Sequence, residues 1–201
     1  MRARVSPMRL AIFGGTFDPI HDAHLTIARR AADEFHLLCI LFVPAAHPPH
    51  KAGVTSAPYA ARVRMAELAA QGDPRFEVSR LEENTVRSYS IDTIEKVRAR
   101  MEPADELFFI IGADAFAEIR TWRRWEEVLR AVHFIVVSRP GHRYEIPASA
   151  KVGRLDTLDL AISSSDIRRA LAAGQRPDGI PESVLEYIFE NGLYGVRPAW
   201  P

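Results

Sequence analysis

Two histidines lie three residues apart, directly after a glycine pair, in the segment GGTFDPIHDAH (Gly14–His24). Glycines at the end of a strand let a ligand approach the backbone closely, and the free N–H groups of a helix start favour phosphate. His21 and His24 can face one side of the first helical turn, where imidazole N–H groups donate to phosphoryl oxygens. The alternative is a histidine pair that only stabilises a turn, but the neighbouring glycines favour phosphate binding.

A second segment with anion-binding side chains is ISSSDIR, residues Ile162–Arg168. Its serine hydroxyls can cap a helix, and Ser163 with Asp166 fits an N-terminal capping pattern. Arg168, in the first helical turn, can then point toward the anion that the helix N–H groups hold. A capped helix with a solvated arginine is the alternative that the spacing leaves open.

A loop and a strand end supply further candidates. Lys51 follows a pair of prolines, which reduce the entropy lost in placing the next side chain. Gly112 ends an apolar run and Asp114 opens a helix, so its carboxylate can accept a ribose hydroxyl. His47 and His50 repeat the H-x-x-H spacing, but tight zinc sites need three or four ligands. Because neither a cysteine cluster nor H-E-x-x-H is present, we expect no protein-bound metal.

Apolar runs that alternate with helical patterns predict how these residues are positioned. Strands separated by helices of this length favour an α/β fold with a single Rossmann-like, doubly wound parallel sheet, helices on both faces and a C-terminal helical segment. Ligands of such sheets bind beyond the carboxyl ends of the strands, where the candidate residues fall. The predicted strands are 8–13, 37–43, 76–79, 106–112, 133–138 and 155–161; the predicted helices are 23–35, 59–70, 90–101, 113–119, 122–131, 164–173 and 181–191.

Composition excludes several classes of protein. The 26 Lys and Arg balance the 26 Asp and Glu, so we expect no broad binding to nucleic acid or to an anionic membrane. No apolar run approaches the ~20 residues that span a bilayer. The absence of G-x-G-x-x-G and of G-x-x-x-x-G-K-[ST] weighs against Rossmann dehydrogenases and P-loop proteins. The single cysteine, Cys39, fits core packing in a reducing, cytoplasmic compartment. Residues 1–7 are predicted to be a flexible extension and residues 8–201 a single domain.

The turn GGTFDPIH…H resembles the nucleotidyltransferase superfamily whose hallmark is an (H/T)-x-G-H turn, and particularly the bacterial nicotinate-mononucleotide adenylyltransferases. ISSSDIR is similar to the second motif of that family, I-S-S-T-x-I-R, with Ser165 in place of threonine. Ser88-Tyr89-Ser90 is similar to its S-Y-T, and the likeness runs from about Met8 to Tyr194. Ala23 stands where the family usually has glycine, a change that we expect to move the nucleotide slightly without abolishing activity.

The resemblance implies adenylyl transfer from ATP to nicotinate mononucleotide, which yields deamido-NAD and pyrophosphate in NAD biosynthesis. The phosphate of the mononucleotide attacks the α-phosphorus in line, without a covalent intermediate, and Mg²⁺ is carried by the ATP phosphates. The alternatives are a related adenylyl- or cytidylyltransferase for another phosphorylated acceptor, such as phosphopantetheine, and a non-catalytic nucleotide-binding protein. A homo-oligomer and the strictness of nicotinate over nicotinamide are left open.

The resemblance also implies roles for individual residues, with Trp122 stacking on the pyridine ring and Ser90 reading the nicotinate carboxylate. For Trp122, a place in the core is the alternative. The implied catalytic residues are His21, His24, Lys51 and Arg168; the implied ATP-binding residues are Gly14, Gly15, Thr16, Phe17, His21, His24, Gly112, Asp114, Ile162, Ser164, Ser165 and Arg168; and the implied mononucleotide-binding residues are Lys51, Ser90, Trp122 and Arg123.

Overall fold

Six parallel strands form one sheet in the order β3-β2-β1-β4-β5-β6 in the computed structural model, which describes residues 7–47, 56–139, 141, 143–156 and 162–196. The order reverses between β1 and β4, as in the doubly wound sheet that the sequence predicts. The strands are β1 (Arg9–Gly15), β2 (Cys39–Pro44), β3 (Phe76–Val78), β4 (Glu106–Gly112), β5 (His133–Ser138) and β6 (Lys151–Asp156).

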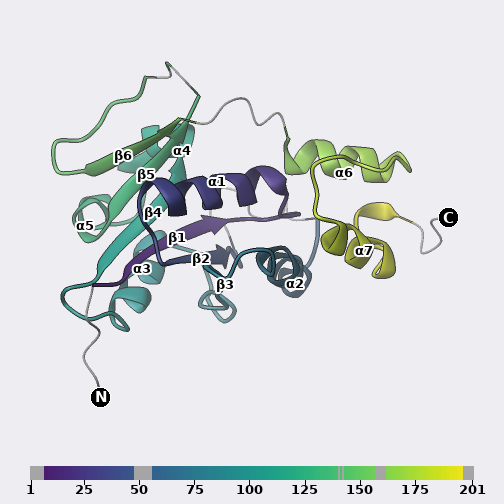
Figure 1. The fold of residues 1–201 in the computed structure, drawn as a ribbon, viewed down its shortest axis with the longest axis horizontal. Coiled ribbons are helices and arrows are strands. Elements are labelled where there is room, and N and C mark those ends of the chain that lie inside the picture. Colours follow the sequence, from purple (N-terminus) through teal and green to yellow (C-terminus); the bar gives the residue numbers. More distant parts are fainter. Residues whose placement is uncertain (1–6, 48–55, 140, 142, 157–161, 197–201) are drawn as a thin grey trace.

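Helices cover both faces of this sheet (Figure 1). Helices α6 and α7 lie at the end toward which β1 points, far from the N-terminus. None of the helices in the described part of the chain is long and apolar enough to cross a membrane. The helices are α1 (Asp22–Glu34), α2 (Tyr59–Ala70), α3 (Ser90–Arg98), α4 (Ala113–Ala117), α5 (Trp125–Ala131), α6 (Ser164–Ala172) and α7 (Glu182–Glu190), with short 3₁₀ turns η2 (Ile119–Thr121) and η3 (Leu193–Gly195).

The core has two halves because successive side chains of a strand point to opposite faces. Along β1, Ala11 and Phe13 join a cluster with α1, α2, α6 and α7, whereas Leu10 and Ile12 join a cluster with α3, α4 and α5. A strand that is covered on both faces must be apolar at nearly every position. That requirement explains the continuous apolar runs from which the strands are predicted.

Strands β1 and β4 separate at their carboxyl ends. Their pairing stops at Phe13 and Ile110. Beyond that point β1 continues to pair with β2 as far as Gly15, and β4 continues to pair with β5 as far as Gly112. The two strands therefore diverge where the strand order reverses, which is the place where ligands bind in doubly wound sheets.

Two elements start three or more residues away from the sequence-based prediction. The helix predicted for 122–131 begins only at Trp125, because Arg124 adopts a left-handed backbone with φ 54°. The last strand begins at Lys151, four residues before the predicted start, and pairs with β5 from His133 onward. Residues 157–161 and 1–6 lie outside the described part of the chain. The single domain and the N-terminal extension therefore stay predictions.

Candidate active site

The two histidines of the glycine turn face each other at the start of α1. His21 is the residue that precedes the helix, and its ring centroid lies 3.8 Å from that of His24. The backbone N–H of His21 donates to Nδ1 of His24 at 3.3 Å. Because Nδ1 accepts this bond, the proton of a neutral His24 is on Nε2. Edge contacts with Phe13 and Phe17 then hold the ring from the core side.

Burial keeps both imidazoles uncharged at neutral pH. It lowers the pKa of His21 to about 4. The pKa of His24 is also well below its ordinary value, mainly through burial and secondly through the neighbouring His21. Desolvation disfavours the charged form of a histidine, and two adjacent cations repel each other. The pair therefore offers neutral N–H donors to an incoming phosphate.

Helix α6 contacts the loop that leads into the histidine turn. Ser164 Oγ donates to the carbonyl of Pro19 at 2.9 Å, and Arg168 Nη1 donates to the carbonyl of Asp18 at 2.6 Å. A guanidinium has five N–H donors, so Arg168 retains further donors for an anion. The second predicted motif thus reaches the first, although 145 or more residues separate the bonded pairs.

The start of α6 has the predicted capping arrangement. Ser163 precedes the helix and accepts the backbone N–H of Asp166 at 3.1 Å, while its hydroxyl donates to the Asp166 carboxylate. Ser165 is exposed and its Oγ accepts from Arg168 at 3.4 Å, so its hydroxyl proton can still be donated. The hydroxyl of Ser164, by contrast, is already used in its bond to Pro19. Ser165 is therefore the better hydroxyl donor toward a phosphate.

The three glycines of the predicted ATP site have different physical roles. A Cβ at Gly15 would lie 2.8 Å from the ring of Phe17, so this position has to be glycine for the ring to pack there. Gly112 has nothing within 4 Å of its Cβ position, and Gly14 meets only Phe109 at 3.7 Å. Gly14 and Gly112 thus leave the backbone open at the divergence of β1 and β4, as the sequence-based interpretation requires. Gly15 serves the core.

Three of the residues predicted for the mononucleotide are described, and they lie at the start of α3 and before α5, on the other face of the sheet. Arg123 places its guanidinium over the ring of Tyr89, 4.7 Å from the centroid, next to Ser90. Trp122 is half-buried and packs edge-on against Phe109, with 5.9 Å between the ring centroids. Since Phe109 also lies against Gly14, contacts connect this group with the glycine turn.

The remaining predicted residues are placed as follows. Helix α4 begins directly after Gly112, and Asp114 is in its first turn. Ile162 packs against Gly179, whose carbonyl accepts the backbone N–H of Asp22 at the start of α1. The side chain of Phe17 is 2% exposed and belongs to the core, so its part in the site is to support His24. Lys51 lies outside the described residues.

Three residues that the sequence-based interpretation omitted join the turn to the rest of the molecule. Asp18 is 4% exposed and accepts hydrogen bonds from the C-terminal Tyr194 and from two backbone N–H groups. Arg62 of α2 is 1% exposed and donates to the carbonyl of Thr16 at 2.6 Å. The sequence carries one signal for Arg62, namely an arginine within the small apolar side chains of AARVRMAELAA. No spacing rule connects Tyr194 with Asp18.

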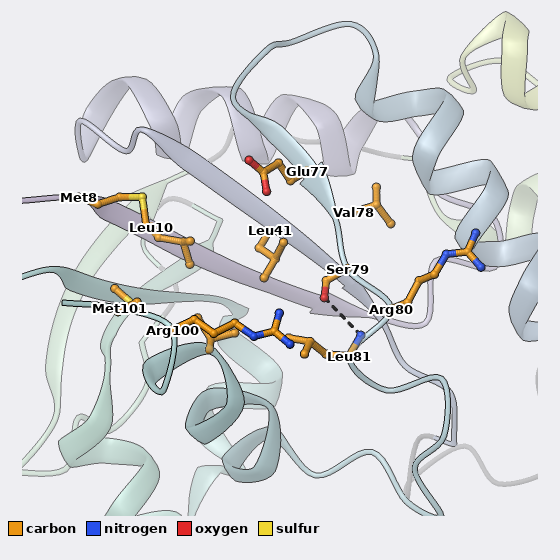
Figure 2. A pocket seen from close by; sticks show the side chains of 11 residues that line it. Met8, Leu10, Leu41, Glu77, Val78, Ser79, Arg80, Leu81, Arg100 and Met101 are labelled. Atoms are coloured by element: carbon orange, nitrogen blue, oxygen red, sulfur yellow. Dashed lines mark hydrogen bonds between the residues drawn. The ribbon is translucent and has the colours of Figure 1, made fainter. Parts of the chain in front are cut away.

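A pocket of about 430 Å³ lies apart from all these residues (Figure 2). Leu10 and Leu41 of the sheet, Met101 after α3 and the segment from Glu77 to Leu81 surround it. None of the predicted site residues that the structure describes lines it. In the described part of the chain, no three His, Cys, Asp or Glu side chains are grouped as a metal site.

A Rossmann-like sheet with a histidine turn at its strand-order reversal defines a class of nucleotide-binding proteins, and comparisons with known proteins identify the family. A family model described as Cytidylyltransferase-like matches residues 12–170. The chain is 68% identical over 187 residues to a protein of Solibacter usitatus named "Probable nicotinate-nucleotide adenylyltransferase", covering 93% of this chain and 100% of that protein. A protein of the same name from Thermus thermophilus is 45% identical over 189 residues, with 93% and 100% covered. The chain therefore belongs to the cytidylyltransferase-like family and, within it, to the nicotinate-nucleotide adenylyltransferases.

Solved structures support the fold. A nicotinic acid mononucleotide adenylyltransferase of Plasmodium falciparum, complexed with NaAD, superposes with a TM-score of 0.77. The alignment covers 96% of this chain and 100% of the other, at 19% sequence identity. At this identity the comparison concerns the arrangement of strands and helices, which confirms the predicted α/β fold.

Proposed function

We propose that this protein transfers the adenylyl group of ATP to nicotinate mononucleotide, forming deamido-NAD and pyrophosphate. The observation that carries the proposal is the histidine pair at the start of α1, 3.8 Å between ring centroids, with Arg168 bonded to the loop before it. These donors lie where β1 and β4 diverge, the site at which such sheets bind nucleotides. The family to which the chain belongs identifies nicotinate mononucleotide as the acceptor of the adenylyl group.

The described side chains suit an in-line attack. The phosphate of the mononucleotide is itself the nucleophile, so the protein has to position two anions and stabilise the charge that develops between them. His24 offers its Nε2–H, while Arg168 and Ser165 direct donors toward the phosphates of ATP. In this proposal Lys51 adds a further cation, and Thr16 and Asp114 line the nucleotide.

The second substrate is proposed to bind on the α3 face. Trp122, half-buried against Phe109, presents aromatic surface to the pyridine ring. The Arg123 guanidinium lies over the ring of Tyr89, the residue that precedes Ser90, and a hydroxyl with a guanidinium suits a carboxylate or a phosphate. The acid form of the mononucleotide therefore fits this group better than the uncharged amide.

Mg²⁺ is proposed to enter with the phosphates of ATP, where it would neutralise charge on the leaving pyrophosphate. Magnesium in nucleotide sites keeps several waters and is held by substrate phosphates with one or two carboxylates, so it needs no protein cage. We further propose a cytoplasmic enzyme that needs neither nucleic acid nor a membrane, because its charge is balanced and its only cysteine is a buried thiol. Light scattering would decide whether the protein forms a homo-oligomer.

The experiment is a product assay with the purified protein. ATP and Mg²⁺ are combined in turn with nicotinate mononucleotide, nicotinamide mononucleotide and phosphopantetheine, and the dinucleotide and pyrophosphate are quantified by chromatography. We expect deamido-NAD from the acid, with kcat/KM about tenfold or more above that for the amide, from one charge-assisted contact. Preference for phosphopantetheine would overturn the proposed acceptor. ATP binding without pyrophosphate release from any acceptor would indicate a non-catalytic nucleotide-binding protein.

A further inference from the structure

The carboxylate of Asp18 is a junction between three segments of the chain. Its Oδ2 accepts the backbone N–H of Ser56 at 2.7 Å. Its Oδ1 accepts both the backbone N–H of Ala57 at 3.1 Å and the hydroxyl of Tyr194 at 2.8 Å. A carboxylate that is 4% exposed is stable only when such donors replace water. All the donors come from outside the histidine turn.

Two of these segments, the histidine turn and residues 56 and 57, adjoin groups that the proposed reaction needs. Asp18 is three residues before His21, and its own carbonyl receives the guanidinium of Arg168. Ser56 and Ala57 follow in sequence the predicted loop that carries Lys51. Hydrogen bonds to Asp18 therefore fix the carboxyl end of that loop relative to the histidines.

The amino end of the same loop is also held. The backbone N–H of His47 donates to Ser88 Oγ at 2.9 Å, and the backbone N–H of Ser88 donates to the carbonyl of His47 at 3.1 Å. The carboxylate of Glu82 accepts the N–H of Ala46 at 3.3 Å. With the amino end attached near α3, the bonds to Asp18 decide where the carboxyl end lies.

Tyr194 is held in place by the backbone around it. It has a left-handed backbone with φ 59°, between two glycines that are also left-handed. Burial, and secondly Asp18, raise the pKa of Tyr194, so its hydroxyl stays protonated and donates. A donor fixed in this way sets the rotation of the carboxylate that receives it.

We propose that Asp18 and Tyr194 form a positioning pair for adenylyl transfer: Tyr194 orients the Asp18 carboxylate, which holds the segment after the Lys51 loop against the histidine turn. The pair rests on the proposed function for its kinetic consequence, but its structural part does not. Arg62 bridges the same two segments, since it donates to the carbonyls of Thr16 and Ala57. Loss of the tyrosine hydroxyl therefore loosens the junction without unfolding it.

The test compares Tyr194→Phe with Tyr187→Phe, a matched control on α7 that packs against the same core cluster. Two quantities are measured, namely the steady-state kinetics with ATP and nicotinate mononucleotide and the hydrogen exchange of the Ser56 and Ala57 amides. We expect Tyr194→Phe to lower kcat about tenfold, with each KM changed less than about threefold, and to speed exchange of both amides about tenfold. The control should change neither quantity.

A double-mutant cycle tests whether Tyr194 acts through Asp18. Asp18→Asn alone should lower kcat at least as much as Tyr194→Phe, and the double variant should be no slower than Asp18→Asn. Independent, multiplying effects would overturn the pairing, as would unchanged exchange at Ser56 and Ala57 in Tyr194→Phe. Should Asp18→Asn not fold, Tyr194→Phe and its control still decide. If the wild-type protein forms no deamido-NAD, the proposed function is what fails, and the exchange measurement still decides whether Tyr194 holds the two amides.

Discussion

Replacing His24 with alanine is the most direct test of the proposed chemistry. The change removes the Nε2–H donor that is proposed to act on the reacting phosphates. Loss of one preorganised transition-state donor costs about 2.7–4 kcal/mol, so kcat should fall by about two to three orders of magnitude. Because the donor acts mainly on charge that develops in the transition state, we expect both KM values to stay within about threefold.

The same substitution also affects stability, and the structure gives the size of that effect. His24 accepts a long hydrogen bond from the His21 backbone and makes edge contacts with Phe13 and Phe17, at centroid distances of 6.0 and 5.1 Å. Together these contacts stabilise the fold by about 2 kcal/mol. For a chain of this length the melting temperature should fall by about 4–8 °C. The kinetic loss of about 2.7–4 kcal/mol is therefore larger than the loss of stability, and the two are measured separately.

The assay is steady-state pyrophosphate release at 25 °C, with thermal unfolding followed on the same samples. The exposed His36, just after α1, provides a matched control. Its φ of 50° suits asparagine, so His36→Asn should retain full activity. A folded His24→Ala variant with kcat within about fivefold of the wild type would refute the assignment of His24 as a transition-state donor.

Three further predictions concern substrate binding, pH and packing. Trp122→Ala should raise KM for the mononucleotide about tenfold and KM for ATP less than about threefold, because base–aromatic stacking contributes ~1–3 kcal/mol. His21 has a pKa of about 4 in the fold against 6.5 as its ordinary value. The unfolded chain therefore binds the proton first as the pH falls, and about 3 kcal/mol of stability present above pH 6.5 should be lost by pH 4. Arg62→Met removes the buried guanidinium that donates to the carbonyls of Thr16 and Ala57 and should lower the free energy of unfolding by about 3–5 kcal/mol. Arg64→Met on the same helix should change it by less than about 0.5 kcal/mol.

Each of these three predictions would be contradicted by a specific result. Equal KM increases for both substrates would assign Trp122 to the core. For His21, denaturant unfolding between pH 7.5 and 4 should show a smaller loss of stability in His21→Asn than in the wild type, and equal losses would contradict the buried neutral histidine. An Arg62→Met variant as stable as Arg64→Met would mean that the carbonyl contacts of Arg62 contribute nothing.

The doubly wound parallel sheet and most of its strands could be predicted because strands covered on both faces are apolar at nearly every position. Glu106–Gly112 and His133–Ser138 are apolar throughout their centres, since both faces of their strands are covered, and their bounds follow directly from the runs. The start of the last strand was less predictable. Lys151–Asp156 is at the edge of the sheet and largely exposed to solvent. Its residues are therefore more polar than those of a central strand, and they form no continuous apolar run from which the strand could be predicted.

The start of the candidate helix near Trp122 shows the same limit. The periodicity of the segment continues through Arg124, but that residue adopts a left-handed backbone and the helix begins after it. The Arg124 side chain forms ion pairs with Glu95 and Glu127, of which only the latter is a sequence neighbour. The local sequence pattern around Arg124 therefore does not reveal its contact with the distant Glu95.

The sequence by itself determined the local chemistry of this protein: a strand, a glycine turn and a helix start, with imidazoles at positions 21 and 24, and a serine-capped helix that carries Arg168. Those features depend on residues within one helical turn of each other. Only the tertiary structure decided what surrounds the turn. Arg62, Arg168 and Tyr194 reach Thr16 and Asp18 across 46, 150 and 176 residues. A buried carboxylate or guanidinium is stable only with partners, and packing, rather than spacing, brings those partners together.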